Sequence, residues 1–305
     1  MGRVAFVFPG QGAQYPGMGK ALAEVSPAAA EVFRMADAIR PGTSRQCFSG
    51  TAEELTQTGT TQPCMLAVEL AAAAALTEAG VKADMTAGFS LGELAAISYA
   101  HIVEESTSFA LVCRRGQLMQ EAAEAHDTSM AAVVKLENSA VEELCAQFEG
   151  VYPVNYNCPG QVTVAGLKSR MPAFSAAVKA AGGRALPLKV SGGFHSPFMA
   201  EAAEMFGETL KTLEFSEPTV PVYSNVTGLP YDGAPKDLLT RQICSPVRWE
   251  AIIRNMIAAG ADTFLEVGPG SVLQGLIKKI DANVRVFGVS VAESLKTAIQ
   301  EVTTC

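Results

Sequence analysis

The 305-residue sequence has few of the groups that metal sites and disulfide frameworks need. It contains only three histidines, His101, His126 and His195, and one tryptophan, and charged residues make up 18% of it. None of the seven cysteines forms a Cys-x-x-Cys pair or has a histidine at metal-ligand spacing. The sequence therefore predicts neither a metal nor another cofactor, and it predicts reduced, mostly buried thiols.

Long hydrophobic runs and an excess of positive charge are also missing. The longest apolar run, residues 65–76, contains Glu69 and is shorter than the roughly 20 residues that cross a bilayer. Residues 1–4 lead directly into a strand-like segment without a signal-peptide pattern. The formal net charge of −8 disfavours nucleic acid. These absences predict a cytoplasmic protein that binds neither membrane nor nucleic acid, and nothing requires more than a monomer.

Short apolar segments alternate with longer helical patterns, which is typical of a parallel sheet covered by helices on both faces. The predicted strands are residues 4–8, 85–88, 220–225, 263–267 and 284–289, and the helical stretches include 91–99, 109–121, 249–259 and 271–280. Residues 131–190 instead follow the order β-α-β-β-α-β of a ferredoxin-like unit. The predicted class is α/β, with a large domain of residues 1–127 and 192–305 and a small domain of residues 128–191.

A nucleophile elbow is predicted at Gly88-Phe89-Ser90-Leu91-Gly92, where a predicted strand gives way to a helix. Glycines two residues before and after the serine allow a sharp reversal that exposes its Oγ. The helix that follows directs free backbone N–H groups at whatever the serine attacks, which favours an oxyanion. Ser90 is therefore the predicted nucleophile.

His195 is the predicted base for Ser90. It follows a glycine pair, Gly192-Gly193, on a tight turn where backbone can approach a ligand. His101 lies near the end of the helix after Ser90, and His126 lies in a polar stretch that we expect to be an exposed loop. Ser90 belongs to the predicted large domain and His195 comes just after the inserted small domain, so we expect the reaction in the cleft between the two domains.

Arg115 is placed by helical periodicity on the apolar side of its helix, beside residues such as Leu111 and Met119. A buried guanidinium without an anion costs several kcal/mol. Arg115 should therefore have a permanent carboxylate partner or bind an anionic substrate, and a structural salt bridge or a snorkelling side chain remains the alternative.

Eight motifs resemble those of malonyl-CoA:acyl carrier protein transacylases, which supply fatty-acid and polyketide synthesis, and they extend from the first strand to about residue 280. They are Phe8-Pro9-Gly10-Gln11-Gly12-Ala13-Gln14, Thr61-Gln62-Pro63, Gly88-Phe89-Ser90-Leu91-Gly92-Glu93, Arg115-Gly116, Asn155-Tyr156-Asn157-x-Pro159-Gly160-Gln161, Phe194-His195-Ser196-Pro197, Ser245-Pro246-Val247-Arg248-Trp249 and Glu266-Val267-Gly268-Pro269-Gly270. The resemblance implies an α/β-hydrolase-like core with a ferredoxin-like insert, and ping-pong transfer of a malonyl group from malonyl-CoA to acyl carrier protein through a malonyl-serine.

The resemblance also implies roles for individual residues. Ser90 would be acylated, and His195 would act as base and then as acid. The remaining implied roles are an oxyanion hole from the backbone N–H groups of Gln11 and Leu91, a carboxylate clamp at Arg115, a pocket wall at Gln62, and a backbone carbonyl at Gln242 that orients the base.

Two aromatic positions bear on the substrate. The family usually has histidine where this chain has Phe89, and an apolar ring can neither hydrogen-bond the malonyl group nor tune the serine. The motif match by itself therefore does not set the substrate preference or the rate. Phe194, directly before His195, resembles the malonyl-type enzymes more than those that take a methylmalonyl unit.

Two other functions compete with transfer. A thioesterase or esterase shares the elbow and generally has an acidic residue between serine and histidine in the sequence, for which Asp127 is a candidate. A non-catalytic module that binds the carrier protein is the second, although such a module would not need Ser90 and His195.

Positive charge in the predicted small domain could meet an acidic carrier protein. Lys179, Arg184 and Lys189 are the candidates, and ordinary solvated surface is the alternative for all three.

Overall fold

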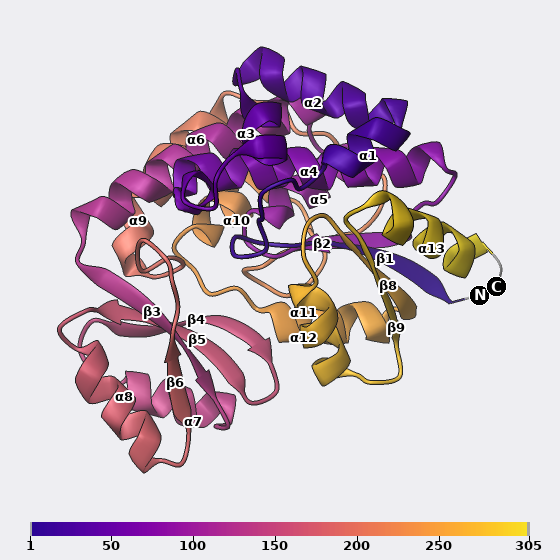
Figure 1. The fold of residues 1–305 in the computed structure, drawn as a ribbon. Coiled ribbons are helices and arrows are strands. Elements are labelled where there is room, and N and C mark those ends of the chain that lie inside the picture. Colours follow the sequence, from indigo (N-terminus) through magenta and orange to yellow (C-terminus); the bar gives the residue numbers. More distant parts are fainter. Residues whose placement is uncertain (1, 304–305) are drawn as a thin grey trace.

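The computed structural model describes residues 2–303 as two sheets with helices packed around them (Figure 1). The strands in this range are β1 (Arg3–Phe8), β2 (Met85–Gly88), β3 (Thr128–Val134), β4 (Val151–Cys158), β5 (Gln161–Leu167), β6 (Arg184–Pro187), β7 (Val222–Tyr223), β8 (Ala261–Val267) and β9 (Arg285–Val289). The helices are α1 (Lys20–Val25), α2 (Pro27–Ile39), α3 (Thr43–Ser49), α4 (Thr58–Glu78), α5 (Gly92–Tyr99), α6 (Glu105–Ala125), α7 (Asn138–Cys145), α8 (Met171–Ala180), α9 (Ala200–Lys211), α10 (Pro235–Gln242), α11 (Trp249–Ala258), α12 (Val272–Ile280) and α13 (Ala292–Thr303), with 3-10 turns at Glu54–Thr56 and Pro197–Met199.

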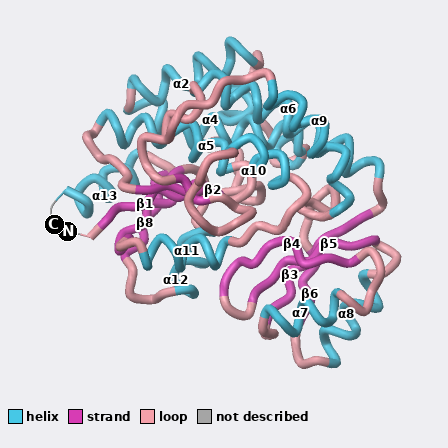
Figure 2. Tube along the Cα trace, turned by 180° about the vertical axis from the view of Figure 1, so that it is seen from behind, coloured by secondary structure: helices cyan, strands magenta, loops and turns pink. Residues whose placement is uncertain are grey.

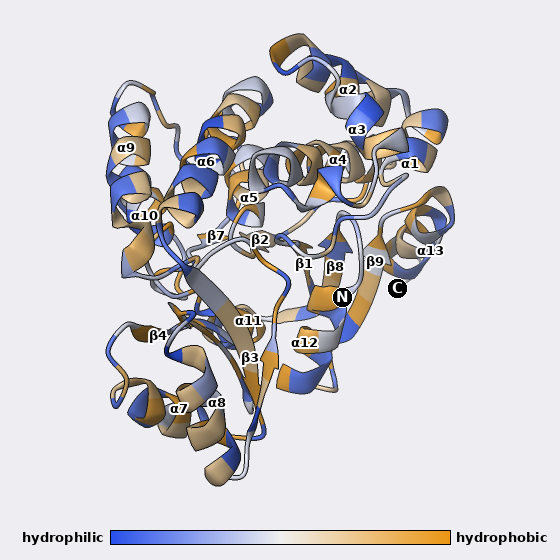
Figure 3. Cartoon of the chain, turned by 60° about the vertical axis from the view of Figure 1, so that its left-hand side comes forward, coloured by the Kyte–Doolittle hydropathy of each residue, from blue (hydrophilic) through white to orange (hydrophobic). Residues whose placement is uncertain are grey.

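The larger sheet is parallel and is buried on both faces. Its order is β7-β2-β1-β8-β9, and every neighbouring pair runs parallel. In β1, Phe6 and Phe8 pack into the core beneath α2, α4 and α5, whereas Ala5 and Val7 pack against α11 and α12. The helices on both sides carry hydrophobic and hydrophilic residues (Figure 3). The predicted parallel sheet with helices on both faces is confirmed.

Two predicted strands end earlier than expected. β7 stops at Tyr223, because the backbone of Ser224 turns away and pairs with Leu229 instead of continuing the ladder. β6 ends at Pro187, although the N–H of Leu188 still donates to the backbone oxygen of Met130 at 2.9 Å. The other predicted strands and helices agree with the structure within a few residues at each end, although α6 extends beyond the predicted 109–121 in both directions.

The smaller sheet is antiparallel, with the order β4-β5-β3-β6 (Figure 2). The predicted element order β-α-β-β-α-β is confirmed, with β5 lying between β3 and β4. One face packs against α7 and α8, whereas Met130, Val154 and Ala165 point toward the core of the larger sheet. Backbone hydrogen bonds between β4 and Val247 link the sheet to the segment before α11. These contacts bring the small sheet against the elbow side of the large one.

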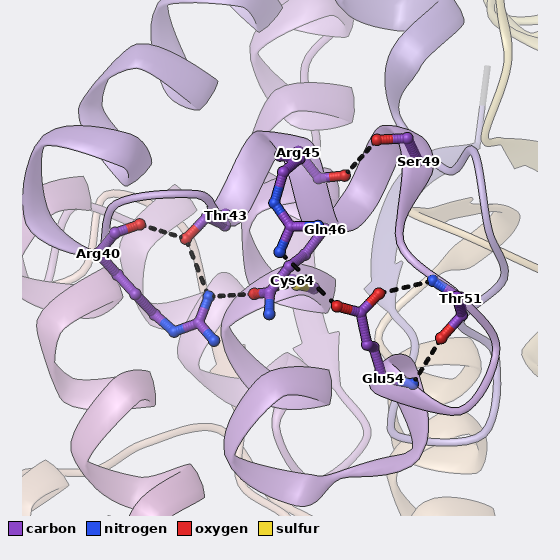
Figure 4. A network of polar contacts seen from close by, with 8 residues as sticks. All are labelled: Arg40, Thr43, Arg45, Gln46, Ser49, Thr51, Glu54 and Cys64. Atoms are coloured by element: carbon purple, nitrogen blue, oxygen red, sulfur yellow. Dashed lines mark hydrogen bonds and ion pairs between the residues drawn. The ribbon is translucent and has the colours of Figure 1, made fainter.

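The longest apolar run of the sequence lies in α4, which is buried almost all around. Among residues 2–303, no helix is both long and apolar enough to cross a membrane. The segment before α4 is tied down by the network in Figure 4, in which Arg40 donates to Gln46 Oε1 at 2.6 Å and Arg45 pairs with Glu54 at 3.7 Å. This network supports the start of α4, the helix that carries Gln62.

The described cysteines are all free thiols, in agreement with the prediction. Four are buried and two are half-buried: Cys47, Cys64, Cys145 and Cys158, and Cys113 and Cys244. Cys305 lies outside the described residues.

Candidate active site

The turn between β2 and α5 has the geometry of a nucleophile elbow, and its glycines are sterically required. A Cβ on Gly88 would lie 1.8 Å from the carbonyl carbon of Gly92, and one on Gly92 would lie 2.4 Å from the carbonyl oxygen of Phe8. Ser90 has a φ of 57°, in the left-handed region that non-glycine residues rarely adopt. Contacts on both sides of the turn hold this strained conformation. The turn presents the serine hydroxyl at the carboxyl edge of the parallel sheet.

The side chains of Ser90 and His195 are in contact, although 105 positions separate the two residues in the sequence. Ser90 Oγ lies 2.7 Å from His195 Nε2, and His195 Nδ1 lies 2.9 Å from the backbone carbonyl oxygen of Gln242. A carbonyl only accepts, so Nδ1 carries the proton and Nε2 is left to accept from the serine hydroxyl. This is the tautomer that a general base for Ser90 needs.

Burial and charge together weaken His195 as a base. Burial, and next the positive charge of Arg115, lower its pKa to about 4, and hydrogen bonds to the backbone at Gln242 and Ser245 offset part of this shift. His195 is 4% exposed, and its imidazole is neutral at pH 7. The imidazole can therefore accept a proton from Ser90 throughout the neutral pH range, although it is a weak base.

The low pKa of His195 predicts an acid-shifted pH profile for modification of Ser90. We expect the rate with an uncharged serine reagent to fall through a midpoint near pH 4, because only the unprotonated imidazole accepts the serine proton. A solvated histidine would give a midpoint near pH 6.5. Rates measured between pH 3.5 and 8 distinguish the two, and a midpoint above pH 6 would contradict the buried, Arg115-facing environment.

The other candidate bases and the candidate acid lie elsewhere. His101 and His126 are both exposed; His101 lies two residues beyond the end of α5, and His126 directly follows α6. Asp127 pairs with Lys168 at 2.6 Å, and its side chain is 77% exposed. His195 is thus oriented by a backbone carbonyl, and Asp127 takes no part in the contact with its Nδ1.

Arg115 is buried beside the nucleophile and is held by uncharged groups. Its Nη1 donates to Gln62 Oε1 at 2.8 Å, and its Nη2 donates to Gln242 Oε1 at 2.8 Å and to Ser90 Oγ at 3.2 Å. Burial lowers its pKa only to about 10, and the charge of Glu93 opposes that shift, so the guanidinium is charged at pH 7. The residue as a whole is 1% exposed. It therefore presents a positive charge next to Ser90 Oγ, and none of its three hydrogen-bond acceptors is a carboxylate.

Two buried residues, Asn225 and Glu93, and the half-buried Tyr231 complete the network, and sequence analysis assigned a role to none of them. Asn225 Oδ1 accepts from the backbone N–H of Ser90 at 2.7 Å, which braces the strained elbow. Glu93 accepts from Tyr231 Oη at 2.6 Å and from Gln242 Nε2 at 2.8 Å. Burial raises the pKa of Glu93 to about 7 despite these donors. The place of Asn225 directly beyond β7, the neighbour of β2, was a usable signal, because parallel strands end at the same edge.

Two residues at the pocket over Ser90 have backbone N–H groups without a hydrogen-bond acceptor among the described residues. Gln11 and Leu91 both line the same pocket as Ser90, Gln11 from the loop after β1 and Leu91 from the start of α5. Among the described residues, no hydrogen bond takes up the backbone N–H of either one. Donors that are left free at this position suit a developing oxyanion.

The pocket over Ser90 is small, about 90 Å³, and lies between the two sheets. Its walls include two residues singled out in the sequence, Gln62 and Phe194, and Phe89, whose ring lies 5.5 Å from that of Trp249. A larger cavity of about 690 Å³ lies around the ends of α4 and α5 and contains none of these residues. The volume over Ser90 suits a short acyl group.

Comparisons with known proteins agree along the whole chain. A family model described as the acyl transferase domain matches residues 5–304. The chain is 40% identical to a malonyl CoA-acyl carrier protein transacylase of Bacillus subtilis, covering 98% of this chain and 97% of that one, and 38% identical to one of Escherichia coli, covering 98% and 100%.

Solved structures give the same result. The malonyl CoA-acyl carrier protein transacylase of Clostridium perfringens superposes with a TM-score of 0.96 at 34% identity, covering 99% of this chain and 98% of that one. A malonyl-transacylase in complex with its type II PKS acyl-carrier protein superposes with a TM-score of 0.94 at 36% identity, covering 98% and 99%.

Proposed function

The chain belongs to the malonyl CoA-acyl carrier protein transacylase family, and on that premise we propose that Ser90 carries the malonyl group, that His195 moves the protons and that Arg115 binds the malonyl carboxylate. The enzyme is an acyltransferase that moves a malonyl group from malonyl-CoA to acyl carrier protein in fatty-acid or polyketide synthesis. One observation carries the assignment of residues. Ser90 Oγ has the imidazole of His195 at 2.7 Å and the guanidinium of Arg115 at 3.2 Å.

The first half-reaction forms the malonyl-serine. His195 Nε2 takes the proton from Ser90 Oγ as the oxygen attacks the thioester carbon of malonyl-CoA. The resulting oxyanion is bound by the backbone N–H groups of Gln11 and Leu91, and one such donor typically contributes about 10²–10³ in turnover. The tetrahedral intermediate then collapses, the carbon–sulfur bond breaks, and CoA leaves with the proton that His195 had taken.

The second half-reaction reverses these steps with a different thiol. The phosphopantetheine thiol of the carrier protein enters the same pocket and gives its proton to His195 Nε2. The thiolate attacks the ester carbon of the malonyl-serine, and His195 returns the proton to Ser90 Oγ as it leaves. The carrier complex of a similar transacylase supports this partner.

Arg115 gives the site its preference for a diacid. In a malonyl ester on Ser90, the free carboxylate is one methylene away from the acyl carbon, within reach of the guanidinium beside Ser90 Oγ. A bound carboxylate also offsets the positive charge that lowers the pKa of His195. The correct substrate thereby strengthens the base that acts on it.

Replacing Arg115 tests the clamp directly. We expect Arg115→Ala to lower kcat/KM for malonyl-CoA by about 10²-fold, because one charge-assisted bidentate contact is lost, and to narrow or reverse the preference over acetyl-CoA. Steady-state rates with both thioesters measure the change. Unchanged malonyl transfer, without a gain toward acetyl-CoA, would contradict the role of Arg115.

Transfer and hydrolysis differ in the fate of the acyl group. We expect malonyl-CoA alone to leave a malonyl adduct on Ser90, visible by intact-protein and peptide mass spectrometry. Added carrier protein should discharge this adduct to malonyl-carrier faster than water releases free malonate. Rapid release of free acid without carrier protein would favour a thioesterase, and the absence of an adduct on Ser90 would contradict the proposed nucleophile.

We also propose the finer fold description and the surface that meets the carrier. The parallel-sheet part, residues 1–127 and 192–305, is taken as an α/β-hydrolase-like domain on account of its elbow, and residues 128–191 as a ferredoxin-like domain on account of their strand order. The side chains of Lys179, Arg184 and Lys189 are exposed, which is compatible with contact to an acidic carrier. The enzyme is proposed to act as a monomer.

A further inference from the structure

Arg115 is held closely by its neighbours, but none of the groups that accept its hydrogen bonds is charged. Its three acceptors, on Gln62, Gln242 and Ser90, are two amide oxygens and a hydroxyl. A carboxylate does belong to the same network, because Glu93 is fully buried next to Gln242. Glu93 Oε2, however, accepts from Gln242 Nε2 at 2.8 Å and has no hydrogen bond to Arg115 among the described residues.

The amide of Gln242 is held in one orientation. Its Nε2 donates both of its protons, one to the backbone oxygen of Ser90 at 2.7 Å and one to Glu93 Oε2. An amide nitrogen has two protons, so only Oε1 remains to face Arg115. Both ends of the side chain are therefore committed, and the guanidinium meets an oxygen that carries a dipole but no net charge.

A direct ion pair would serve a different purpose. A carboxylate at the position of the Gln242 amide would compensate the buried guanidinium more fully, but it would occupy the fork that a substrate carboxylate needs. We propose that Gln242 is a specificity-determining residue, an inference that rests on the clamp proposed above for Arg115. Its uncharged side chain separates Glu93 from Arg115. It holds the guanidinium in place and leaves the positive charge available to the substrate carboxylate. This role is separate from that of the backbone carbonyl of Gln242, which orients His195.

Exchanging the two side chains moves the charge and conserves the composition. In the double variant Glu93→Gln/Gln242→Glu, net charge and side-chain size are retained, and the carboxylate moves one side chain closer to Arg115. We expect the KM for malonyl-CoA to rise about 10- to 100-fold, since an internal anion now competes for the guanidinium. The rate for acetyl-CoA, which has no carboxylate, should change much less. A double variant with an unchanged KM for malonyl-CoA would overturn the proposal.

Two single variants separate charge from hydrogen bonding and protect against a folding failure of the double variant. Gln242→Met removes the amide without adding charge, whereas Gln242→Glu adds a carboxylate at the same place. We expect Gln242→Glu to raise the KM for malonyl-CoA clearly more than Gln242→Met does. Equal effects would mean that the lost hydrogen bonds are responsible, and the spacer proposal would then be wrong.

Chemical labelling of Ser90 tests separately whether the elbow and the base remain intact in these variants. The backbone carbonyl of Gln242 is present in every variant, so labelling of Ser90 by an uncharged serine reagent gives each variant its own baseline. We expect kcat/KM for malonyl-CoA to fall more than the labelling rate does. Slow labelling that parallels the loss of malonyl transfer would show general damage and overturn the specific role. Arg115→Ala distinguishes the clamp hypothesis from the spacer hypothesis. If Arg115→Ala leaves malonyl transfer unchanged, the clamp is refuted. If only the exchange of Glu93 and Gln242 leaves the KM for malonyl-CoA unchanged, the spacer alone is refuted.

Discussion

Ser90→Ala should abolish transfer, lowering kcat by about 10⁴-fold or more while the fold is retained. The serine oxygen is the only group at the elbow apex that can take the acyl group, and its loss leaves only binding and the oxyanion donors. The backbone of the elbow is braced by Asn225 Oδ1 on the N–H of Ser90, a contact that alanine keeps. The measurement is carrier malonylation, together with the mass of the protein after exposure to malonyl-CoA.

A second variant shows whether Ser90 and His195 act as a unit. The kcat of His195→Ala should be nearly as low as that of Ser90→Ala. The kcat of the double variant should be no lower, because the nucleophile and the base act together in the same step. Thermal unfolding of all three variants controls for folding. A malonyl adduct that persists on Ser90→Ala would refute the nucleophile, and additive losses would refute the joint action with His195.

Gly88→Ala should have the largest effect on stability and should also eliminate activity. The added Cβ would lie 1.8 Å from the carbonyl carbon and 1.9 Å from the carbonyl oxygen of Gly92, and 2.2 Å from the nitrogen of Glu93. These are backbone atoms of the elbow and of the first turn of α5, so they cannot rotate away as a side chain would. We expect a loss of about 3 kcal/mol or more in the free energy of unfolding, measured by denaturant titration.

A glycine in a helix with open space around it gives the matched control. Apart from atoms of its own helix backbone and its chain neighbours, no heavy atom lies within 4 Å of a Cβ placed on Gly275 in α12. Gly275→Ala should therefore stabilise the protein by up to about 1 kcal/mol, through helix propensity and a less flexible unfolded chain, and activity should be unchanged. If Gly88→Ala were tolerated as well as Gly275→Ala, the sharp reversal at the elbow would be refuted.

Much of this arrangement could be anticipated from local patterns. The glycine spacing around Ser90 predicts an elbow because a sharp strand-to-helix turn has few solutions, and the small number of histidines left little choice of base. Helical periodicity placed Arg115 on the buried side of α6, where the structure has it. The alternation of short strands and helices predicted a parallel sheet, and it is observed.

Other features carried no local signal. Glu93 is part of a recognisable motif, but nothing in its neighbourhood predicts that its carboxylate is buried against the side chains of Tyr231 and Gln242. The role suggested for Gln242 came from family resemblance and concerned its backbone oxygen alone. The end of β7 at Tyr223 was likewise hidden, because Ser224 pairs with a residue beyond the turn.

The elements and their approximate order follow from local sequence patterns, because periodicity, glycine spacing and residue type act over a few neighbouring positions. The surroundings of the charge on Arg115 depend instead on contacts between distant parts of the chain. Its amide partners come from α4 and α10, and Gln242 lies 152 positions from Ser90, so their meeting depends on how the helices pack around the parallel sheet. Burial then sets the pKa of Glu93 and His195, and burial is a property of the folded whole.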